Sequence, residues 1–169
     1  EPSSLKLQKF TIMTWFKRKG DGSFADTESF TDGIPLVTKG VAQYELNDNR
    51  DMNYWLGIKN STKVLAADFE DMATGANHPV YGVTTIQDNV WYHAAVTYNG
   101  STWKLYLNGR LEKEQYEGAT PRYDSIQDNG IGVSLTSKGA SSGSFNGTID
   151  EVRIYNRALS EEELSLIHI

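Results

Sequence analysis

The chain has 169 residues and a formal net charge of −6, from 16 Lys and Arg against 22 Asp and Glu. This length fits a single domain over residues 1–169, and the negative charge disfavours electrostatic binding to nucleic acid or anionic lipid. Cysteine is absent, which excludes thiolate zinc sites and cysteine nucleophiles, and no run of about 18 apolar residues could span a membrane.

Short segments rich in β-branched and aromatic residues alternate with turn residues, which is typical of an all-β sandwich. The first is residues 10–16 (FTIMTWF), and the polar stretch 17–32 after it predicts a long loop. A second, flexible loop is expected at 137–144 (SKGASSGS). The remaining predicted strands are 36–37, 44–46, 53–58, 64–69, 80–85, 91–98, 103–107, 131–135 and 148–155.

The segments 91–98 and 103–107 predict a hairpin closed by a turn at 99–102. Asn108-Gly109 predicts a two-residue turn next, and the charged segment 110–116 after it is typical of an edge strand. Because alternate strand residues share a face, His93, Thr97, Lys104 and Tyr106 should point away from the core. The core-facing residues are then Tyr92, Ala94, Val96, Tyr98, Trp103, Leu105 and Leu107.

One short helix is predicted near the end of the sequence. Ser160 can cap its first turn, and Glu163 stands three residues later as the partner in a capping box. Leu164 and Ile167 would give this helix a one-sided apolar stripe.

A second hairpin is predicted with residues 59–62 as its turn, which places Met52 opposite Phe69 and Leu56 opposite Leu65 on a core face. The other face then presents Trp55 as an exposed ring beside an amide and carboxylates, a composition typical of a carbohydrate platform. The alternative is that Trp55 packs under the following loop. The candidate ligand-binding residues are Trp55, Asn53, Asp68 and Glu70, with Asn77, His78 and Tyr81 in the next loop.

The same register places Asp51 directly opposite Glu70, with Asp68 nearby. Like charges facing each other destabilise a sheet unless a cation lies between them, and calcium prefers oxygen ligands. Asp51 and Glu70 are therefore candidate metal ligands. The alternatives are a solvated charged face or a shifted register.

Three segments carry a family resemblance: FTIMTWFKRKG (10–20) followed by PLVTKG (35–40), WYHAAVTYNGSTWKLYLNGR (91–110), and GTIDEVRIYNRALSEEEL (147–164). They resemble a laminin G-like (LamG-like) jelly-roll domain of the concanavalin A-like lectin/glucanase superfamily. The resemblance implies a two-sheet antiparallel jelly-roll β-sandwich with a short C-terminal helix. It also implies an extracellular, often bacterial, setting within a larger multidomain protein.

The chain departs from this family at its start, because only nine residues precede FTIMTWF and the usual first strand is expected to be missing. Glu1 is not an initiator Met, so the numbering is expected to start inside a longer reading frame or after processing. Three explanations stay open for the missing strand: a fragment, coverage of the gap by residues 166–169, or coverage by another chain. The resemblance also implies a structural calcium at Asp150, the alternative being an Asp that pairs with a cation or caps a turn. Ile149 and Val152 cannot share a face in a regular strand, so a one-residue irregularity is expected there.

No Glu is followed two positions later by Asp, so the Glu-x-Asp-x-x-Glu motif of the glucanases with this fold is absent, and we expect no enzyme active site. The predicted function is a non-catalytic carbohydrate- or protein-binding module of a secreted or cell-surface protein. Its partner would be a glycan or an extracellular protein, and self-association through an exposed sheet edge is a further expectation. The alternatives are a structural or assembly spacer and, less favoured, a glycan-degrading enzyme domain.

Overall fold

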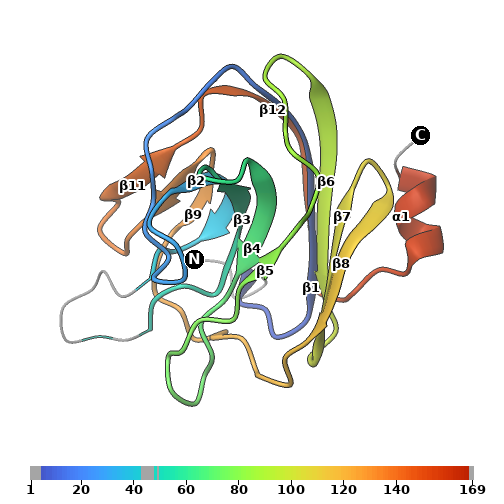
Figure 1. Cartoon of the computed structure of the whole chain (residues 1–169). Helices are drawn as coiled ribbons and strands as arrows, with labels where there is room; N and C mark the ends of the chain where they lie inside the picture. The colour runs from blue at the N-terminus through green and yellow to red at the C-terminus, as the bar shows by residue number, and fades with distance from the viewer. Residues whose placement is uncertain (1–4, 43–47, 49, 168–169) are drawn as a thin grey trace.

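Two five-stranded antiparallel sheets face each other in the computed structural model, which describes residues 5–42, 48 and 50–167 (Figure 1). The sheet called here the β1 sheet has the order β12-β1-β6-β7-β8, and the β3 sheet has the order β5-β4-β3-β2-β9. A separate ribbon pairs β10 with β11. The predicted all-β, two-sheet sandwich is confirmed.

The β1 sheet contains the hairpin that the sequence predicts most fully. The ladder pairs Tyr98 with Trp103, so the turn at 99–102 is confirmed, and all seven predicted core-facing residues belong to the main buried cluster. The strands of this sheet are β12 (Gly147–Tyr155), β1 (Phe10–Arg18), β6 (Trp91–Tyr98), β7 (Thr102–Leu107) and β8 (Arg110–Tyr116).

The strands β3 and β4 keep their predicted faces but not the predicted register, and Met52, expected on the core face, belongs instead to the buried cluster of Phe30, Trp55 and Ala66. Leu56 pairs with Ala67, two residues away from the expected partner, because the turn comes one residue later than predicted. Asp32 holds that turn, since its backbone carbonyl accepts the Asn60 N–H at 3.0 Å and its carboxylate accepts the Ser61 N–H. The strands are β5 (Val80–Tyr81), β4 (Val64–Asp68), β3 (Tyr54–Lys59), β2 (Gly33–Lys39) and β9 (Asn129–Ile131).

Three other predicted segments differ from the structure. The strand expected at 131–135 is split into β9 and β10 (Val133–Leu135) at Gly132, which has a φ of 70° that suits glycine. The predicted loop 137–144 contains β11 (Ser141–Ser144), which pairs with β10. The strand expected at 80–85 ends at Tyr81: the Gly82 N–H still donates to the Leu65 carbonyl of β4 at 2.8 Å, but the Val83 and Thr84 N–H groups donate to the Glu112 carboxylate. The strand predicted at 44–46 lies outside the described residues.

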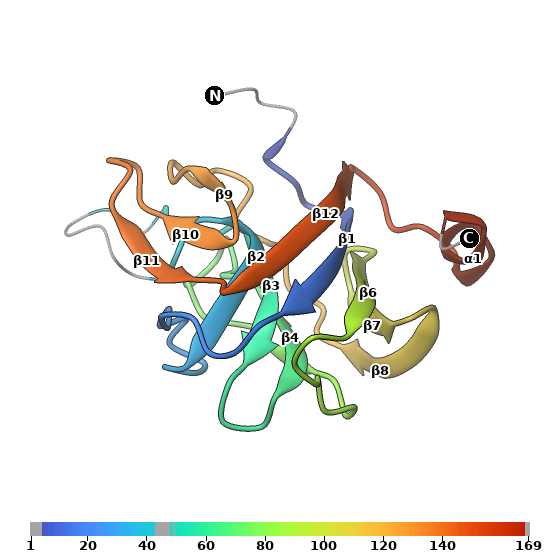
Figure 2. The same cartoon turned by 90° about the horizontal axis from the view of Figure 1, so that it is seen from above.

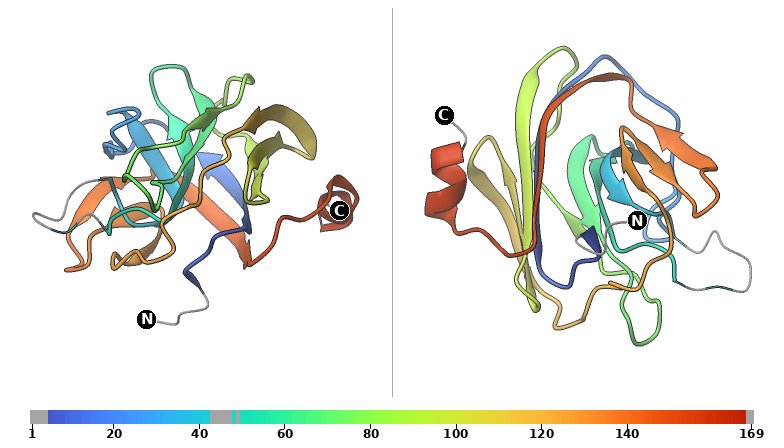
Figure 3. Two further views of the ribbon diagram at one scale, coloured as in Figure 1. Left: turned by 90° about the horizontal axis from the view of Figure 1, so that it is seen from below. Right: turned by 180° about the vertical axis from the view of Figure 1, so that it is seen from behind.

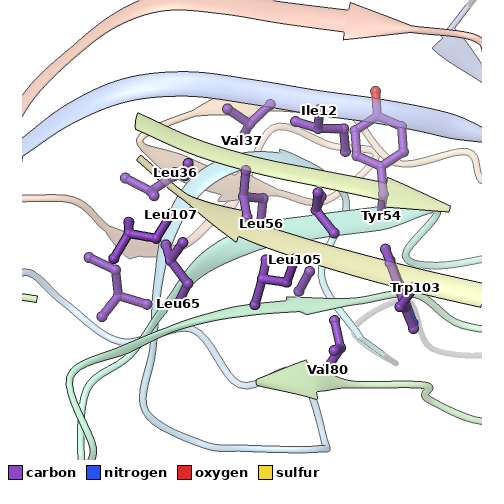
Figure 4. Packing of buried hydrophobic residues seen from close by; sticks show 14 of the residues in the cluster. Ile12, Leu36, Val37, Tyr54, Leu56, Leu65, Val80, Trp103, Leu105 and Leu107 are labelled. Carbon is purple, nitrogen blue, oxygen red and sulfur yellow. The ribbon is translucent and has the colours of Figure 1, made fainter. Parts of the chain in front are cut away.

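The main core lies between the two sheets, and Figure 4 shows side chains from both sheets meeting there. Trp103, Phe10, Tyr54 and Tyr98 are fully buried at one end of it, with Phe10 and Trp103 ring centres 5.6 Å apart. Alternating apolar residues on paired strands supply this interior, as period-two patterning requires.

The outer faces of both sheets are partly covered. Helix α1 (Glu161–Ile167) packs against the β1 sheet, on the side away from the β3 sheet (Figures 1 and 2). Phe30, from the loop between β1 and β2, packs on Trp55 of the β3 sheet. The β10–β11 ribbon lies at the opposite end of the molecule from α1 (Figure 3).

The predicted helix start is confirmed. The Ser160 hydroxyl accepts the Glu163 N–H at 3.2 Å, and the Glu163 carboxylate accepts the Ser160 N–H at 2.9 Å, which is a complete capping box. Leu164 of this helix faces the β1 sheet, and Leu166 is exposed. Within the described part of the chain, no helix is long and apolar enough to cross a membrane.

The strand β12 lies at an open edge of the β1 sheet, because it pairs only with β1 among the described strands.

Candidate functional site

The predicted exposed position of Trp55 is wrong. Its side chain is only 1% exposed, lies edge-on to Phe30 with ring centres 5.2 Å apart, and donates from Nε1 to Ser134 Oγ at 3.1 Å. The loop between β1 and β2 covers the face on which Trp55 was expected to meet a ligand. Phe30 in a mostly polar loop is a weak sequence signal for this cover, because Phe24 in the same loop is 47% exposed.

Asn53 is also buried and serves a structural purpose. Its side-chain oxygen accepts the Leu7 N–H at 2.8 Å, and its amide donates to the Leu7 carbonyl at 2.8 Å. These two bonds attach the segment before β1 to the start of β3. A buried amide that satisfies a neighbouring backbone in this way is already fully engaged on that side.

The directly opposed Asp51 and Glu70 pair is not formed. Continuing the observed register places Asn53 opposite Glu70, in keeping with the Glu70 N–H that donates to the Met52 carbonyl at 3.3 Å. Asp51 and Glu70 are both buried, and Asp51 accepts a hydrogen bond from Gln127 at 2.9 Å. The shifted register, one of the alternatives named from the sequence, explains this placement. The prediction of a metal site at Asp51 and Glu70 assumed that the two residues lie directly opposite each other, and they do not.

The structure does bring Asp68, Asn77, His78 and Tyr81 together around the connection from β4 to β5. Asp68 is fully buried and its Oδ1 accepts the His78 N–H at 3.0 Å. Asn77 donates from its amide to the Thr27 carbonyl, and Tyr81 packs edge-on against Phe30 with ring centres 5.8 Å apart. Burial raises the pKa of Asp68 to about 7, although the His78 N–H and the nearby hydroxyl groups of Ser29 and Thr27 act in the opposite direction.

His78 lies between two carboxylates. Its Nδ1 is 2.8 Å from Glu117 Oε2, its Nε2 is 3.0 Å from Asp71 Oδ2, and its ring stacks on Phe69. Burial alone would lower the pKa of His78, but the two carboxylates outweigh it and raise that pKa above its usual value. In the protonated form both ring nitrogens donate, and His78 then joins the β4–β5 connection to the segment after β8.

The same arrangement acts on Asp71. Burial would raise the pKa of Asp71, but hydrogen bonds from His78 and Thr74 outweigh burial and lower it to about 2. Asp71 is therefore ionised at neutral pH, and it favours the protonated form of His78. We refer to Asp71, His78 and Glu117 as the histidine clamp.

The expected irregularity at Asp150 is confirmed. The ladder between β1 and β12 shifts register opposite Thr14, Glu151 has a φ of 51°, and Ile149 and Val152 both pack against the core. Asp150 is exposed and its Oδ1 accepts the Glu151 N–H at 2.8 Å, as in the turn-capping alternative. Calcium at Asp150 stays a prediction. Among the residues that the structure describes, no group of three or more His, Asp or Glu side chains is arranged to hold a metal ion.

The outer face of the β1 sheet carries a row of residues that the sequence reasoning did not propose as a binding site, although it placed His93 on this face. Register pairs Trp15 with His93 and Lys17 with Trp91, and alternation turns all four away from the core that Phe16 and Tyr92 enter. Arg153 on β12 lies beside them, opposite Met13. We call Trp15, Lys17, Trp91, His93 and Arg153 the outer strip. Its sequence signal is the aromatic residue next to each core residue, Trp15 before Phe16 and Trp91 before Tyr92.

The outer strip contains a depression of about 300 Å³, lined by Met13, Trp15, His93, Glu151, Arg153 and Ile167. The Trp15 and His93 rings lie 5.3 Å apart, and Trp91 is 41% exposed with Lys17 Nζ 5.2 Å above its ring. Arg153 forms an exposed ion pair with Glu151 at 2.7 Å. The depression thus combines aromatic surface with charged hydrogen-bonding groups. The bulge at Glu151 determines the position of the Glu151 carboxylate in it.

Comparison with solved structures gives close matches in fold at low sequence identity. The sialidase module CBM40 of Ruminococcus gnavus, bound to α2,3-sialyllactose, has a TM-score of 0.75 at 18% identity, over 99% of this chain and 86% of that one. Domain 4 of an extracellular arabinanase from Geobacillus stearothermophilus, in complex with arabinotriose, has a TM-score of 0.58 at 17% identity, over 99% of this chain and 69% of that one. A pentraxin from Limulus polyphemus has a TM-score of 0.63 at 15% identity, over 96% and 70%.

These likenesses show a shared fold. A search of curated protein sequences gives no match. The family model described as the concanavalin A-like lectin/glucanases superfamily matches residues 1–165, which is nearly the whole chain. The resemblance found in the sequence is confirmed, and the chain belongs to the concanavalin A-like lectin/glucanases superfamily.

Proposed function

We propose that this chain is a non-catalytic carbohydrate-binding module of a larger secreted or cell-surface protein. The strongest support is the fold match over 99% of the chain to a carbohydrate-binding module in complex with sialyllactose. The arabinanase domain in complex with arabinotriose supports the same class of ligand. Membership of the superfamily is compatible with glycan binding, but fold alone does not specify function, so the site must be argued from its residues.

We propose the outer strip as the glycan-binding surface. Sugars present apolar C–H faces that pack against aromatic rings, and their hydroxyl groups bond to charged and amide side chains. Trp15 and Trp91 supply rings on neighbouring strands, while Arg153 and Glu151 supply charged groups at the depression. Because β1 and β6 are paired strands of one rigid sheet, these groups keep their spacing without a ligand, which lowers the entropy lost on binding.

Hydrolysis is less well supported. Retaining glycosidases with two carboxylates place them about 5–5.5 Å apart, and the strand motif that does so in glucanases of this fold is absent from the sequence. His78 is held by two carboxylates, so it is not a free base. A non-catalytic role remains the proposal.

Calorimetric titration with sialyllactose and with arabinotriose, preceded by a glycan array, tests this proposal directly. Trp15→Ala and Trp91→Ala should each weaken binding by about tenfold or more, since central aromatic contacts contribute most to such interfaces. Tyr116→Ala is the matched control, because Tyr116 is 77% exposed at the end of β8 and outside the outer strip. Absence of binding to every glycan would refute the function. Binding that survives both tryptophan changes would refute this site alone.

A further inference from the structure

Three buried oxygen atoms near the β4–β5 connection have no hydrogen-bond partner: Thr27 Oγ1, Asp68 Oδ2 and Asn77 Oδ1. Thr27 and Asp68 are both fully buried. Buried polar atoms are nearly always paired in folded proteins, so several unpaired atoms in one place require a reason. They come from three different segments: the loop between β1 and β2, the end of β4, and the β4–β5 connection.

Contacts on all sides bring these segments together. The Asn77 amide donates to the Thr27 carbonyl, and Asn77 forms a bridge with Glu70 two residues beyond Asp68. The His78 N–H donates to the other oxygen of Asp68 at 3.0 Å. The hydroxyl groups of Thr27 and Ser29 are near enough to Asp68 to act on its pKa. A carboxylate, an amide carbonyl and hydroxyl groups thus converge beneath the loop.

The charge at this place is not balanced by a basic side chain. Lys59, which lies over the rings of Phe30 and Tyr81 nearby, forms its ion pair with Asp32 at 3.3 Å. Within the described part of the chain, Asp68 has no ion pair with Lys or Arg. A buried carboxylate without a positive partner is costly, and it is normally neutralised by a proton or by a bound cation.

The donor set indicates which kind of cation would fit. All of the available donors are oxygen atoms, a set that hard cations such as calcium prefer, whereas zinc and copper favour sites with nitrogen or sulfur ligands. Carboxylate, side-chain amide carbonyl and hydroxyl oxygens are all hard donors. A single carboxylate gives weak affinity, in the range of about 10⁻⁴–10⁻³ M found for extracellular calcium modules.

We propose that the side chains of Asp68, Asn77 and Thr27 bind a calcium ion, which fastens the loop between β1 and β2 onto the β3 sheet. This site is separate from Asp150 and from the outer strip, and it holds whether or not the domain binds glycans. The ion would lie beside Trp55, since Trp55 pairs with Asp68 in the ladder. The loop that covers Trp55 would then be attached by the ion as well as by Phe30.

Thermal unfolding of the chain after chelator treatment, without calcium and with calcium at about 10–100 mM, tests the site, since this range is about 100 times the expected dissociation constant. Calcium at about 100 times its dissociation constant should raise the free energy of unfolding by about 2.7 kcal/mol, which is RT multiplied by the natural logarithm of one plus that ratio. The shift should be lost in Asp68→Asn and in Thr27→Val and kept in Asp150→Asn. Matched sodium chloride controls for ionic strength.

Terbium luminescence excited through tryptophan gives a second readout that does not depend on stability. Asn77→Ala should lose this signal even if Asp68→Asn fails to fold. The proposal is overturned if calcium leaves the melting temperature of the wild type unchanged, or if Asp150→Asn removes the shift and Asp68→Asn retains it. Without a calcium effect, stability that falls as the pH rises toward about 7 would instead assign a protonated Asp68.

Discussion

The histidine clamp predicts a pH-dependent contribution to stability that a single substitution can isolate. His78→Gln removes the positive charge that lies between Asp71 and Glu117, both of which are largely buried. The Asp71 pKa falls from 3.8 to about 2, and each pKa unit corresponds to about 1.4 kcal/mol. Because Thr74 supplies part of that shift and the groups are partly hydrated, we expect His78→Gln to cost about 2 kcal/mol near pH 5.

The sign of the pH dependence follows from the two pKa shifts. The pKa of His78 is raised, so its contribution is complete below about pH 6.5 and is lost as the pH rises through the higher value of the folded state. The pKa of Asp71 is lowered, so its contribution is present above about pH 4 and is lost as the pH falls toward 2. The clamp should therefore be strongest between about pH 4 and 6.5.

Thermal unfolding of the wild type and of His78→Gln across this range measures the effect. A loss of about 2 kcal/mol lowers the melting temperature by about 4–8 °C for a domain of this size. The difference in melting temperature between the wild type and His78→Gln should become smaller above the folded-state pKa of His78. Glu117→Gln and the double variant complete a mutant cycle, in which the two single effects should not add. If the difference in melting temperature stays constant between about pH 5 and 9, the assignment of His78 as a charged partner is refuted.

In calcium-free buffer, Asp68 adds a pH dependence to stability that must be separated from the effect of the histidine clamp. Burial raises its pKa to about 7, so between about pH 4 and 7 the folded state binds more protons than the unfolded state, and stability falls as the pH rises. This contribution is present in both the wild type and His78→Gln. The difference between the two proteins therefore reports the clamp, while their common slope reports Asp68.

Three further predictions concern the stability and the self-association of the domain. Trp55→Ala should cost about 3–5 kcal/mol in chemical denaturation, because a fully buried ring and its bond to Ser134 are removed, and an unchanged midpoint would contradict that burial. Gly57→Ala should cost about 1–3 kcal/mol, since the added Cβ would lie 2.2 Å from the Ile34 carbonyl oxygen; full stability would contradict this close approach. Self-association along the open edge of β12 predicts a dimer in light scattering that a proline in this strand abolishes, whereas a monomer at every concentration would contradict it.

The pairing of strands was predictable wherever a turn is closed by local residues. The hairpin of β6 and β7 shows this, because Asn99 caps its own turn and accepts the N–H groups of Ser101 and Thr102 at 3.0 and 2.9 Å. The hairpin of β3 and β4 shows the limit, since its turn is held by Asp32 from a distant loop. A long-range contact of this kind leaves no trace in the spacing of the hairpin itself.

The candidate site residues were also predictable only in part. Alternation correctly put Trp55 and Asp68 on the face of β3 and β4 that points away from the main core, and His93 on the outer face of the β1 sheet. Side-chain alternation could not show that Phe30 covers the outer face of the β3 sheet, or that Trp91 stays 41% exposed on the outer face of the β1 sheet. Whether an outward residue meets solvent depends on which loop lies over it.

From the amino-acid sequence alone follow the β class, the two faces of each main strand, the capped helix at Ser160 and the family. All of these depend on near neighbours along the chain, because side-chain alternation, capping and tight turns are local. The tertiary structure decided the burial of Trp55, the unpaired oxygens at Asp68 and the carboxylates on His78. Each of these joins segments far apart in sequence, and burial of a polar group depends on everything that packs around it.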